Sequence, residues 1–172
     1  ARLLHYFPRG NKLSSNEDWC GWHNDHGTIT GLTSAMYFDS NNNLVNENLK
    51  LEKTGLWAQT RTGEKVKVAF GQNDIAYQIG ETYQILSGGI LVATPHAVIV
   101  DNDIPSDVHR STYALFMQPK KSLKLEIPLG SSMKNIETSE IYTVPKLQKR
   151  FIRNGMTFDE FDKETLKEFV TN

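Results

Sequence analysis

Two histidines and an aspartate lie within four residues of the segment WCGWHNDHGTITGL, residues 19–32. Imidazole and carboxylate groups of this kind either form a polar corner of a β domain or bind a metal ion. Side chains at positions i and i+2 of a strand point to the same face, so we expect His23 and Asp25 to converge and His26 to point away. One imidazole and one carboxylate are two of the three ligands of a facial triad, which suits non-haem Fe(II) because three positions stay open.

The third ligand is expected to be a histidine from a distant strand, and His5, His96 and His109 are the remaining histidines. His96 is the strongest candidate, because it follows a glycine turn and lies within the apolar segment GGILVATPHAVIV, where a polar side chain needs a partner. The pattern His-x-Asp with a distant His is weak by itself, since any strand with two polar residues can produce it.

A second pair of polar residues occurs in the segment HRSTYALF. Arg110 and Thr112 are again at i and i+2 and are expected to share a face with Ala114 and Phe116. An arginine that points into a β-barrel is costly unless a carboxylate meets it, and a guanidinium binds a carboxylate through two parallel hydrogen bonds. The alternative is an arginine on a solvated strand face, which is the commoner outcome for this spacing taken alone.

The elements that must position these side chains are mostly short strands. Period-two alternation predicts strands in TITGLTSAMYF, DIAYQIG, ILVATPHAVIV and RSTYALFMQP, and a hairpin with Thr62-Gly63 at its turn in LWAQTRTGEKVKVAF. Pro95 inside the third of these segments favours an edge strand or a bulge. One face of the first segment is expected to carry Thr30, Leu32, Ser34, Met36 and Phe38.

Near the end of the chain the pattern changes to a helix, in which Thr157 and Glu160 form a capping box. Several short strands followed by one helix favour an all-β sandwich or jelly roll with a helical appendage. The apolar stripe of this helix is predicted to consist of Phe158, Phe161, Leu166 and Phe169.

The composition argues against several classes of protein. The 172 residues carry a net charge of −1 with both signs interspersed, so we expect no nucleic acid and no membrane among the partners. No apolar run is long enough to span a bilayer. The single cysteine, Cys20, is expected to pack rather than bind metal, and it favours a reducing compartment, which we take to be cytoplasmic.

Taken together, these segments resemble the isopenicillin N synthase-like branch of the Fe(II)- and 2-oxoglutarate-dependent oxygenases. The resemblance runs in order through LLHYFP, WHNDHGTITGL, QTRTGEKVKV, YQIGETYQILSGGILVATPHAV and RSTYALFMQP, with a weaker match at MTFDEF. It implies a mainly β fold, a double-stranded β-helix (jelly roll) with a C-terminal helix. Residues 1–119 would form the core and residues 120–172 an extension packed on the same domain, whereas the helical N-terminal region of the family is expected to be absent.

The resemblance also implies the site. His23, Asp25 and His96 match the iron ligands of the family. Arg110 matches the arginine of the R-x-S motif that binds the distal carboxylate of 2-oxoglutarate. Thr112 stands where the serine is usual and keeps a hydroxyl group.

Two positions depart from the family pattern. His96 is followed by Ala97, where an arginine is frequent. The Asn-Tyr-Tyr-Pro run of plant-type members is replaced by the residues His5-Tyr6-Phe7-Pro8. Because Phe7 lacks a hydrogen-bond donor, one contact to 2-oxoglutarate is missing unless Tyr6 supplies it, and use of the co-substrate follows less directly than use of iron.

The activity that the resemblance implies is oxidation of a small organic substrate by O2, coupled to decarboxylation of 2-oxoglutarate. Hydroxylation, desaturation and ring closure are all compatible with it, and the sequence identifies neither the substrate nor the oligomeric state. Two alternatives stay open. One is a Zn-dependent hydrolase that uses His23, His26 and His96, although positions i and i+3 of a strand do not share a face. The other is a jelly-roll metal-binding domain without turnover.

Overall fold

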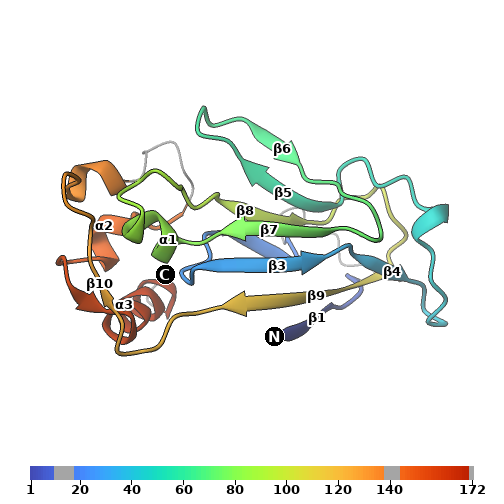
Figure 1. The fold of residues 1–172 in the computed structure, drawn as a ribbon. Coiled ribbons are helices and arrows are strands. Elements are labelled where there is room, and N and C mark those ends of the chain that lie inside the picture. The colour runs from blue at the N-terminus through green and yellow to red at the C-terminus, as the bar shows by residue number, and fades with distance from the viewer. Residues whose placement is uncertain (10–17, 138–143, 171–172) are drawn as a thin grey trace.

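Two antiparallel sheets and a group of helices at one end make up the structure, which is a computed structural model (Figure 1). It describes residues 1–9, 18–137 and 144–170, and for residues 169 and 170 it describes the backbone alone. One-turn 3₁₀ helices lie at Asn46–Asn48 and Met133–Ile136. The strands and α-helices, in chain order, are β1 (Arg2–Tyr6), β2 (Cys20–His23), β3 (Ile29–Thr33), β4 (Met36–Phe38), β5 (Gly55–Gln59), β6 (Lys65–Lys67), β7 (Ile75–Ile79), α1 (Glu81–Leu86), β8 (His96–Ile99), β9 (His109–Met117), β10 (Lys124–Leu125), α2 (Leu147–Arg150), β11 (Met156–Thr157) and α3 (Phe158–Val170).

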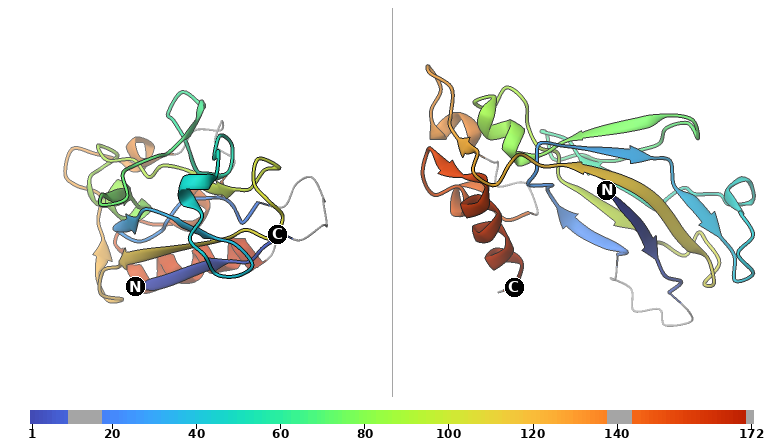
Figure 2. Two further views of the ribbon diagram at one scale, coloured as in Figure 1. Left: turned by 90° about the vertical axis from the view of Figure 1, so that its right-hand side faces the viewer. Right: turned by 60° about the horizontal axis from the view of Figure 1, so that its bottom comes forward.

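The larger sheet has the strand order β1-β9-β3-β7, and β4 pairs with β9 as well. The smaller sheet has the order β2-β8-β5-β6, and β10 and β11 form a separate pair. Every pairing among the described strands is antiparallel. Helices α1, α2 and α3 lie together beyond one end of the sheets (Figure 2). The mainly β architecture predicted from the sequence is therefore confirmed.

The predicted hairpin is present as β5 and β6, with Gly63 at φ 87° in the turn, a backbone conformation that glycine adopts without strain. The neighbouring prediction, one long strand through TITGLTSAMYF, is wrong. The segment divides into β3 and β4 with a break at Ser34 and Ala35. The break shifts the alternation, so Tyr37 is buried and Met36 is exposed.

The position of Pro95 also differs from the prediction. Pro95 precedes β8 instead of lying inside it, and β8 is an interior strand that pairs with both β2 and β5. The carbonyl of Pro95 accepts a hydrogen bond from Gln59 N at 2.8 Å. A proline just before a strand costs the sheet no donor, which reconciles it with an interior position.

The main apolar core lies at the helical end and is not between the sheets. It joins α1, β10, α2, β11 and α3 through Ile85, Leu125, Ile136, Leu147, Phe151, Met156, Phe158 and Phe161.

Helix α3 begins at the predicted capping box. Glu160 N donates to Thr157 Oγ1 at 3.3 Å, and Thr157 N donates to Glu160 Oε2 at 2.7 Å. The buried stripe of the helix contains Phe158 and Phe161 as predicted, but Thr165 is buried and Leu166 is exposed. The side chain of Phe169 lies outside the described residues. Among the described helices, none has the length and apolar character needed to cross a membrane.

Candidate active site

A cavity of about 1020 Å³ is lined by residues from both sheets. The larger sheet contributes inward-facing side chains of β1, β3 and β9, and the smaller sheet contributes β2, β5 and β8. The apolar core is at the helical end, so the inner faces of the strands are free to carry polar groups. The polar residues singled out from the sequence lie in this cavity, namely His23, Asp25, His96, Arg110 and Thr112.

His23, Asp25 and His96 come together at one point of the cavity. Their ligand atoms all lie within 4.8 Å of one another, and among the described residues this is the one group of three that could hold a metal ion. His23 and His96 are cross-strand partners in the pairing of β2 with β8, and their ring centroids are 4.2 Å apart. His23 Nε2 lies 3.9 Å from Asp25 Oδ1.

The reason for this convergence differs from the one expected. Strand β2 ends at His23, so Asp25 lies in the turn that follows and its position is not set by strand alternation. His26 takes no part in the group. His26 Nε2 lies 2.7 Å from Asp162 Oδ1 of α3, and the imidazole stacks on Phe158. The alternative zinc site, which needs His26 beside His23 and His96, is therefore not formed.

Both histidines of the group turn the same nitrogen toward the other ligands. His23 Nδ1 lies 2.7 Å from the Gly21 carbonyl, and His96 Nδ1 lies 3.1 Å from the Thr94 carbonyl. A backbone carbonyl accepts only from an N–H, so each Nδ1 carries a hydrogen and Nε2 is the nitrogen left to bind a metal.

The two imidazoles differ in their electrostatic surroundings. Burial lowers the pKa of His23, but the hydrogen bond and charge of Cys20 and the Gly21 carbonyl outweigh it and raise the pKa to about 9. Burial, followed by the charge of His23, lowers the pKa of His96 to about 4. His96 is consequently neutral at neutral pH, which leaves the lone pair of its Nε2 available to a metal.

Two further side chains hold Asp25. Thr30 Oγ1 donates to Asp25 Oδ2 at 2.5 Å, and Gln78 Nε2 donates to the same oxygen at 2.9 Å. Gln78 Nε2 also lies 2.9 Å from His96 Nε2. Gln78 was not among the residues predicted from the sequence. A signal was present in DIAYQIG, because β7 exposes its apolar residues Ile75 and Tyr77 and turns the polar Gln78 inward.

Arg110 lies in the same cavity, on β9 of the larger sheet, and is 5% exposed. Its Nε and Nη1 atoms have no hydrogen-bond partner among the described residues. Its guanidinium carbon lies 5.1 Å from the centroid of the Tyr6 ring. Tyr6 and Tyr37 hydrogen-bond to the guanidinium, but the two unpartnered nitrogens are costly to bury without an anion, so Arg110 could bind a carboxylate in the cavity. Arg110 therefore lies inside the cavity, and the alternative of an arginine on a solvated strand face does not hold.

Tyr6 and Tyr37 flank Arg110. Both line the cavity, and burial raises the pKa of each, so both hydroxyl groups keep the proton that they would donate. Phe7, by contrast, is 75% exposed. Of the two aromatic residues in the His5-Tyr6-Phe7-Pro8 run, Tyr6 is thus the one that faces the expected co-substrate position.

Thr112 lies two residues after Arg110, is buried, and lines the cavity as expected. Its hydroxyl donates a 3.0 Å hydrogen bond to the Thr33 carbonyl. The oxygen of Thr112 remains available as an acceptor, but a ligand that needs its proton must compete with Thr33.

No protein-family model matches this chain. No curated protein sequence matches it either. Solved structures do match. A full-length protein of Neurospora crassa, solved in complex with alpha-KG, is 19% identical over 99% of this chain and 44% of its own, with a TM-score of 0.62. A Caulobacter crescentus protein assigned to the 2OG-Fe(II) oxygenase family is 22% identical over 97% of this chain and 44% of its own, with a TM-score of 0.62.

The rice dioxygenase for auxin oxidation (DAO) is 16% identical over 97% of this chain and 46% of its own, with a TM-score of 0.59. The fold is that of the 2OG-Fe(II) oxygenases. The oxygenase fold expected from the sequence is confirmed by these matches, while the isopenicillin N synthase-like branch stays a prediction. The chain spans less than half the length of each of these three oxygenase-fold chains.

Proposed function

We propose that the chain is the catalytic core of a non-haem Fe(II) oxygenase that couples decarboxylation of 2-oxoglutarate by O2 to oxidation of a small organic substrate. One observation carries the proposal: a His-Asp-His group and a buried arginine with unpartnered donors share one cavity. In this proposal the two sheets form a double-stranded β-helix. Residues 1–119 make up the oxygenase core, and residues 120–172 are an extension packed on it.

The residues present fit a facially bound Fe(II). His23 and His96 would bind through Nε2 and Asp25 through a carboxylate oxygen, a set of two imidazoles and one carboxylate that selects for this kind of iron site. The backbone carbonyls of Gly21 and Thr94 hold the two rings, and Thr30 and Gln78 hold the carboxylate. Bound Fe(II) would supply activation of O2 for the oxidation, with succinate and CO2 as the products of the co-substrate.

The chain's own residues would bind and orient 2-oxoglutarate. Arg110 offers Nε and Nη1 to the distal carboxylate, and Tyr6 offers a hydroxyl beside it. Thr112 would add a contact once its bond to Thr33 is exchanged. Fixing the carboxylate end sets the direction of the keto acid group, because a bidentate guanidinium contact defines an orientation as well as a position. No side chain is required as a general base.

The substrate is expected to be a small organic molecule. Apolar side chains also line the cavity, among them Leu51, Leu56, Val68 and Phe70. Structural neighbours were solved with such molecules: the Neurospora crassa protein with alpha-KG and thymine, and JOX2 together with 2OG, Fe and JA. We place the protein in a reducing compartment, the cytoplasm, because Cys20 has no second cysteine to pair with.

The test is anaerobic addition of Fe(II) to the purified chain, followed by titration with 2-oxoglutarate. We expect a saturable visible charge-transfer band from the chelate, with no need to know the substrate. The band should be lost in His96→Ala and weakened in Arg110→Ala. Arg61→Ala serves as the matched control, because Arg61 is an exposed arginine at the hairpin turn.

The possible results separate the alternatives. Iron binding without the band points to an oxygenase that does not use 2-oxoglutarate, as the loss of a donor at Phe7 suggests. If both ligands bind but no 2-oxoglutarate is consumed once O2 is admitted, the result points to a metal-binding jelly roll without turnover. Absence of Fe(II) binding by the wild-type chain contradicts the oxygenase proposal.

A further inference from the structure

The turn that joins the ligands His23 and Asp25 is held by residues of the helical end. We infer that a buried ion pair between Glu81 and Arg150, acting through Asn24, positions these two ligands and thereby sets the affinity of the site for its metal. The inference rests on the proposed function, since it takes His23 and Asp25 as metal ligands. Glu81, Arg150 and Asn24 are positioning residues and do not contact the metal.

The ion pair is fully buried and bidentate. Arg150 Nη1 donates to Glu81 Oε2 at 2.6 Å, and Arg150 Nη2 donates to Glu81 Oε1 at 2.5 Å. The side chains are 2% and 0% exposed. Glu81 is the first residue of α1 and Arg150 the last residue of α2, so the pair connects two helices that are distant in the sequence.

Glu81 also makes two hydrogen bonds to the segment that joins His23 and Asp25. Its carboxylate accepts a 3.1 Å hydrogen bond from Asn24 Nδ2, and its backbone N–H donates to the Asp25 carbonyl at 2.8 Å. Asn24 lies between the two ligands in the sequence and is 5% exposed. Any displacement of Glu81 would therefore move the backbone that carries His23 on one side and Asp25 on the other.

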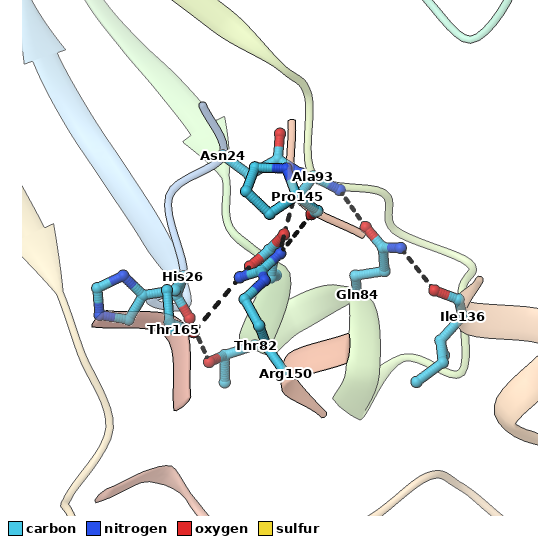
Figure 3. Close-up of polar contacts among 10 residues, drawn as sticks. Asn24, His26, Thr82, Gln84, Ala93, Ile136, Pro145, Arg150 and Thr165 are labelled. Carbon is cyan, nitrogen blue, oxygen red and sulfur yellow. Dashed lines mark hydrogen bonds and ion pairs between the residues drawn. The ribbon is translucent and has the colours of Figure 1, made fainter. Parts of the chain in front are cut away.

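The other end of the pair is fixed by the C-terminal segment. Arg150 donates to the Pro145 carbonyl at 2.9 Å and to Thr165 Oγ1 of α3 at 3.3 Å (Figure 3). The same region holds the next residue of the turn, because Thr82 Oγ1 donates to the His26 carbonyl at 2.7 Å. Residues 24, 25 and 26 are thus each held from α1, α1 is held from α2 through the ion pair, and α2 is held from α3 through Thr165.

Stability alone is a weak reason for such a pair. Burying two charges costs desolvation energy that the ion pair barely recovers, and an apolar pair of similar volume would often stabilise the fold as well or better. Arg150 already lies over the ring of Phe161, a member of the apolar core, with its guanidinium carbon 5.8 Å from the ring centroid, so an apolar pair would have an apolar neighbour. What an apolar pair lacks is the directional contact to Asn24. Residues that orient metal ligands typically change affinity by about ten- to a hundredfold when they are lost.

The decisive experiment compares the wild-type chain with the double variant Glu81→Leu/Arg150→Met, which replaces both charges and leaves neither one unpaired. The readouts are the Kd for Mn(II) and the absorption spectrum of bound Co(II). We expect the double variant to unfold cooperatively on heating, to bind Mn(II) about tenfold or more weakly, and to show an altered Co(II) spectrum. The matched control is Glu164→Leu/Lys167→Met, which removes an exposed pair on α3 (Nζ–Oε1 2.6 Å) and should change neither readout.

A single substitution keeps the inference testable if the double variant does not fold. Asn24→Ala leaves the Glu81–Arg150 pair intact and removes only the link to the turn, so it should raise the Kd for Mn(II). When Asn24→Ala is added to a double variant that folds, the Kd for Mn(II) should change little further, because both sets of substitutions remove the same link between Glu81 and Asn24. Parental affinity and an unchanged Co(II) spectrum in Asn24→Ala would overturn the inference.

The experiment also distinguishes this inference from the proposed function. If the wild-type chain binds Mn(II) and the variants bind it equally well, the positioning role is wrong and the oxygenase proposal stands. If the wild-type chain binds no divalent metal, both are wrong.

Discussion

The side-chain amide of Gln78 donates a hydrogen bond to Asp25, with Nε2 2.9 Å from Oδ2. The same nitrogen lies 2.9 Å from His96 Nε2, which is the nitrogen expected to bind a metal. One amide therefore bridges two of the three candidate ligands. A metal on His96 would take the lone pair that accepts from Gln78, so that hydrogen bond belongs to the metal-free protein alone.

The first prediction concerns Gln78→Leu, which has a similar volume but no donor. The variant removes the bond to His96, which only the metal-free protein makes, while Thr30 still holds the same oxygen of Asp25, so by linkage the variant should bind Mn(II) more tightly. One hydrogen bond of about 0.5–1.5 kcal/mol corresponds to a change of about two- to tenfold in Kd. Isothermal titration with Mn(II) measures it, with Gln72→Leu on the exposed loop before β7 as the control. Weaker binding of Mn(II) by Gln78→Leu would contradict the prediction. It would mean that the hydrogen bond from Gln78 to Asp25 supports metal binding more than the hydrogen bond from Gln78 to His96 opposes it.

A second prediction concerns Tyr6→Phe, which keeps the ring against Arg110 and removes the hydroxyl. If this hydroxyl supplies the contact that Phe7 lacks, the Kd for 2-oxoglutarate should rise by about two- to tenfold, the value of one hydrogen bond. The affinity for Fe(II) should not change. The charge-transfer titration measures both, and Tyr113→Phe on the exposed side of β9 is the control. An unchanged Kd for 2-oxoglutarate would leave Tyr37 and Thr112 as the remaining hydroxyl donors.

Replacing Arg110 by lysine tests whether charge alone binds the co-substrate. Arg110→Lys keeps the positive charge but loses the planar pair of donors, Nε and Nη1, that the structure leaves unpartnered. Hydrogen bonds to a charged group contribute about 1.5–3 kcal/mol, so we expect the Kd for 2-oxoglutarate to rise by about ten- to a hundredfold. Arg61→Lys should leave it unchanged. A parental Kd in Arg110→Lys would contradict bidentate binding by Arg110.

The last prediction concerns the stability of the helical end. Thr157→Ala removes the side chain that caps α3 and accepts from Glu160 N at 3.3 Å. Losing such a cap should lower the free energy of unfolding by about 1 kcal/mol. Urea denaturation followed by circular dichroism measures the change, with Ser122→Ala in an exposed turn as the control. A free energy of unfolding equal to that of the wild-type chain would show that packing of Phe158 and Phe161 holds the helix end without its cap.

Much of the candidate site could be predicted from residue types and spacing. The clustered polar residues His23 and Asp25, the histidine His96 in an apolar segment, and the inward-facing Arg110 all lie in the one cavity. His96 was recognisable because a polar side chain in an apolar segment needs a partner, whereas the spacing of Arg110 taken alone favoured a solvated face and its place in the site came from the resemblance. The capping box of α3 was predictable for a related reason, since it depends on residues only three positions apart.

Other parts of the site could not be predicted from the sequence, because small local irregularities change which side chain faces inward. The break at Ser34 and Ala35 moves Tyr37 into the interior, where strict alternation would have placed Met36. Asp25 joins the site from a turn and not from a strand. A shift of one residue reverses every side chain that follows it, so period-two reasoning fails at such points.

What the sequence by itself determined was the approximate position of several strands, the start of α3 and the kinds of ligand available. Which of these side chains meet was decided by tertiary structure. The β2–β8 register places His23 opposite His96, and the β3–β7 register places Thr30 opposite Gln78. The Glu81–Arg150 pair forms only when the helices pack. The physical reason is that a contact between distant residues depends on strand register and core packing, which are properties of the whole chain and not of any local pattern.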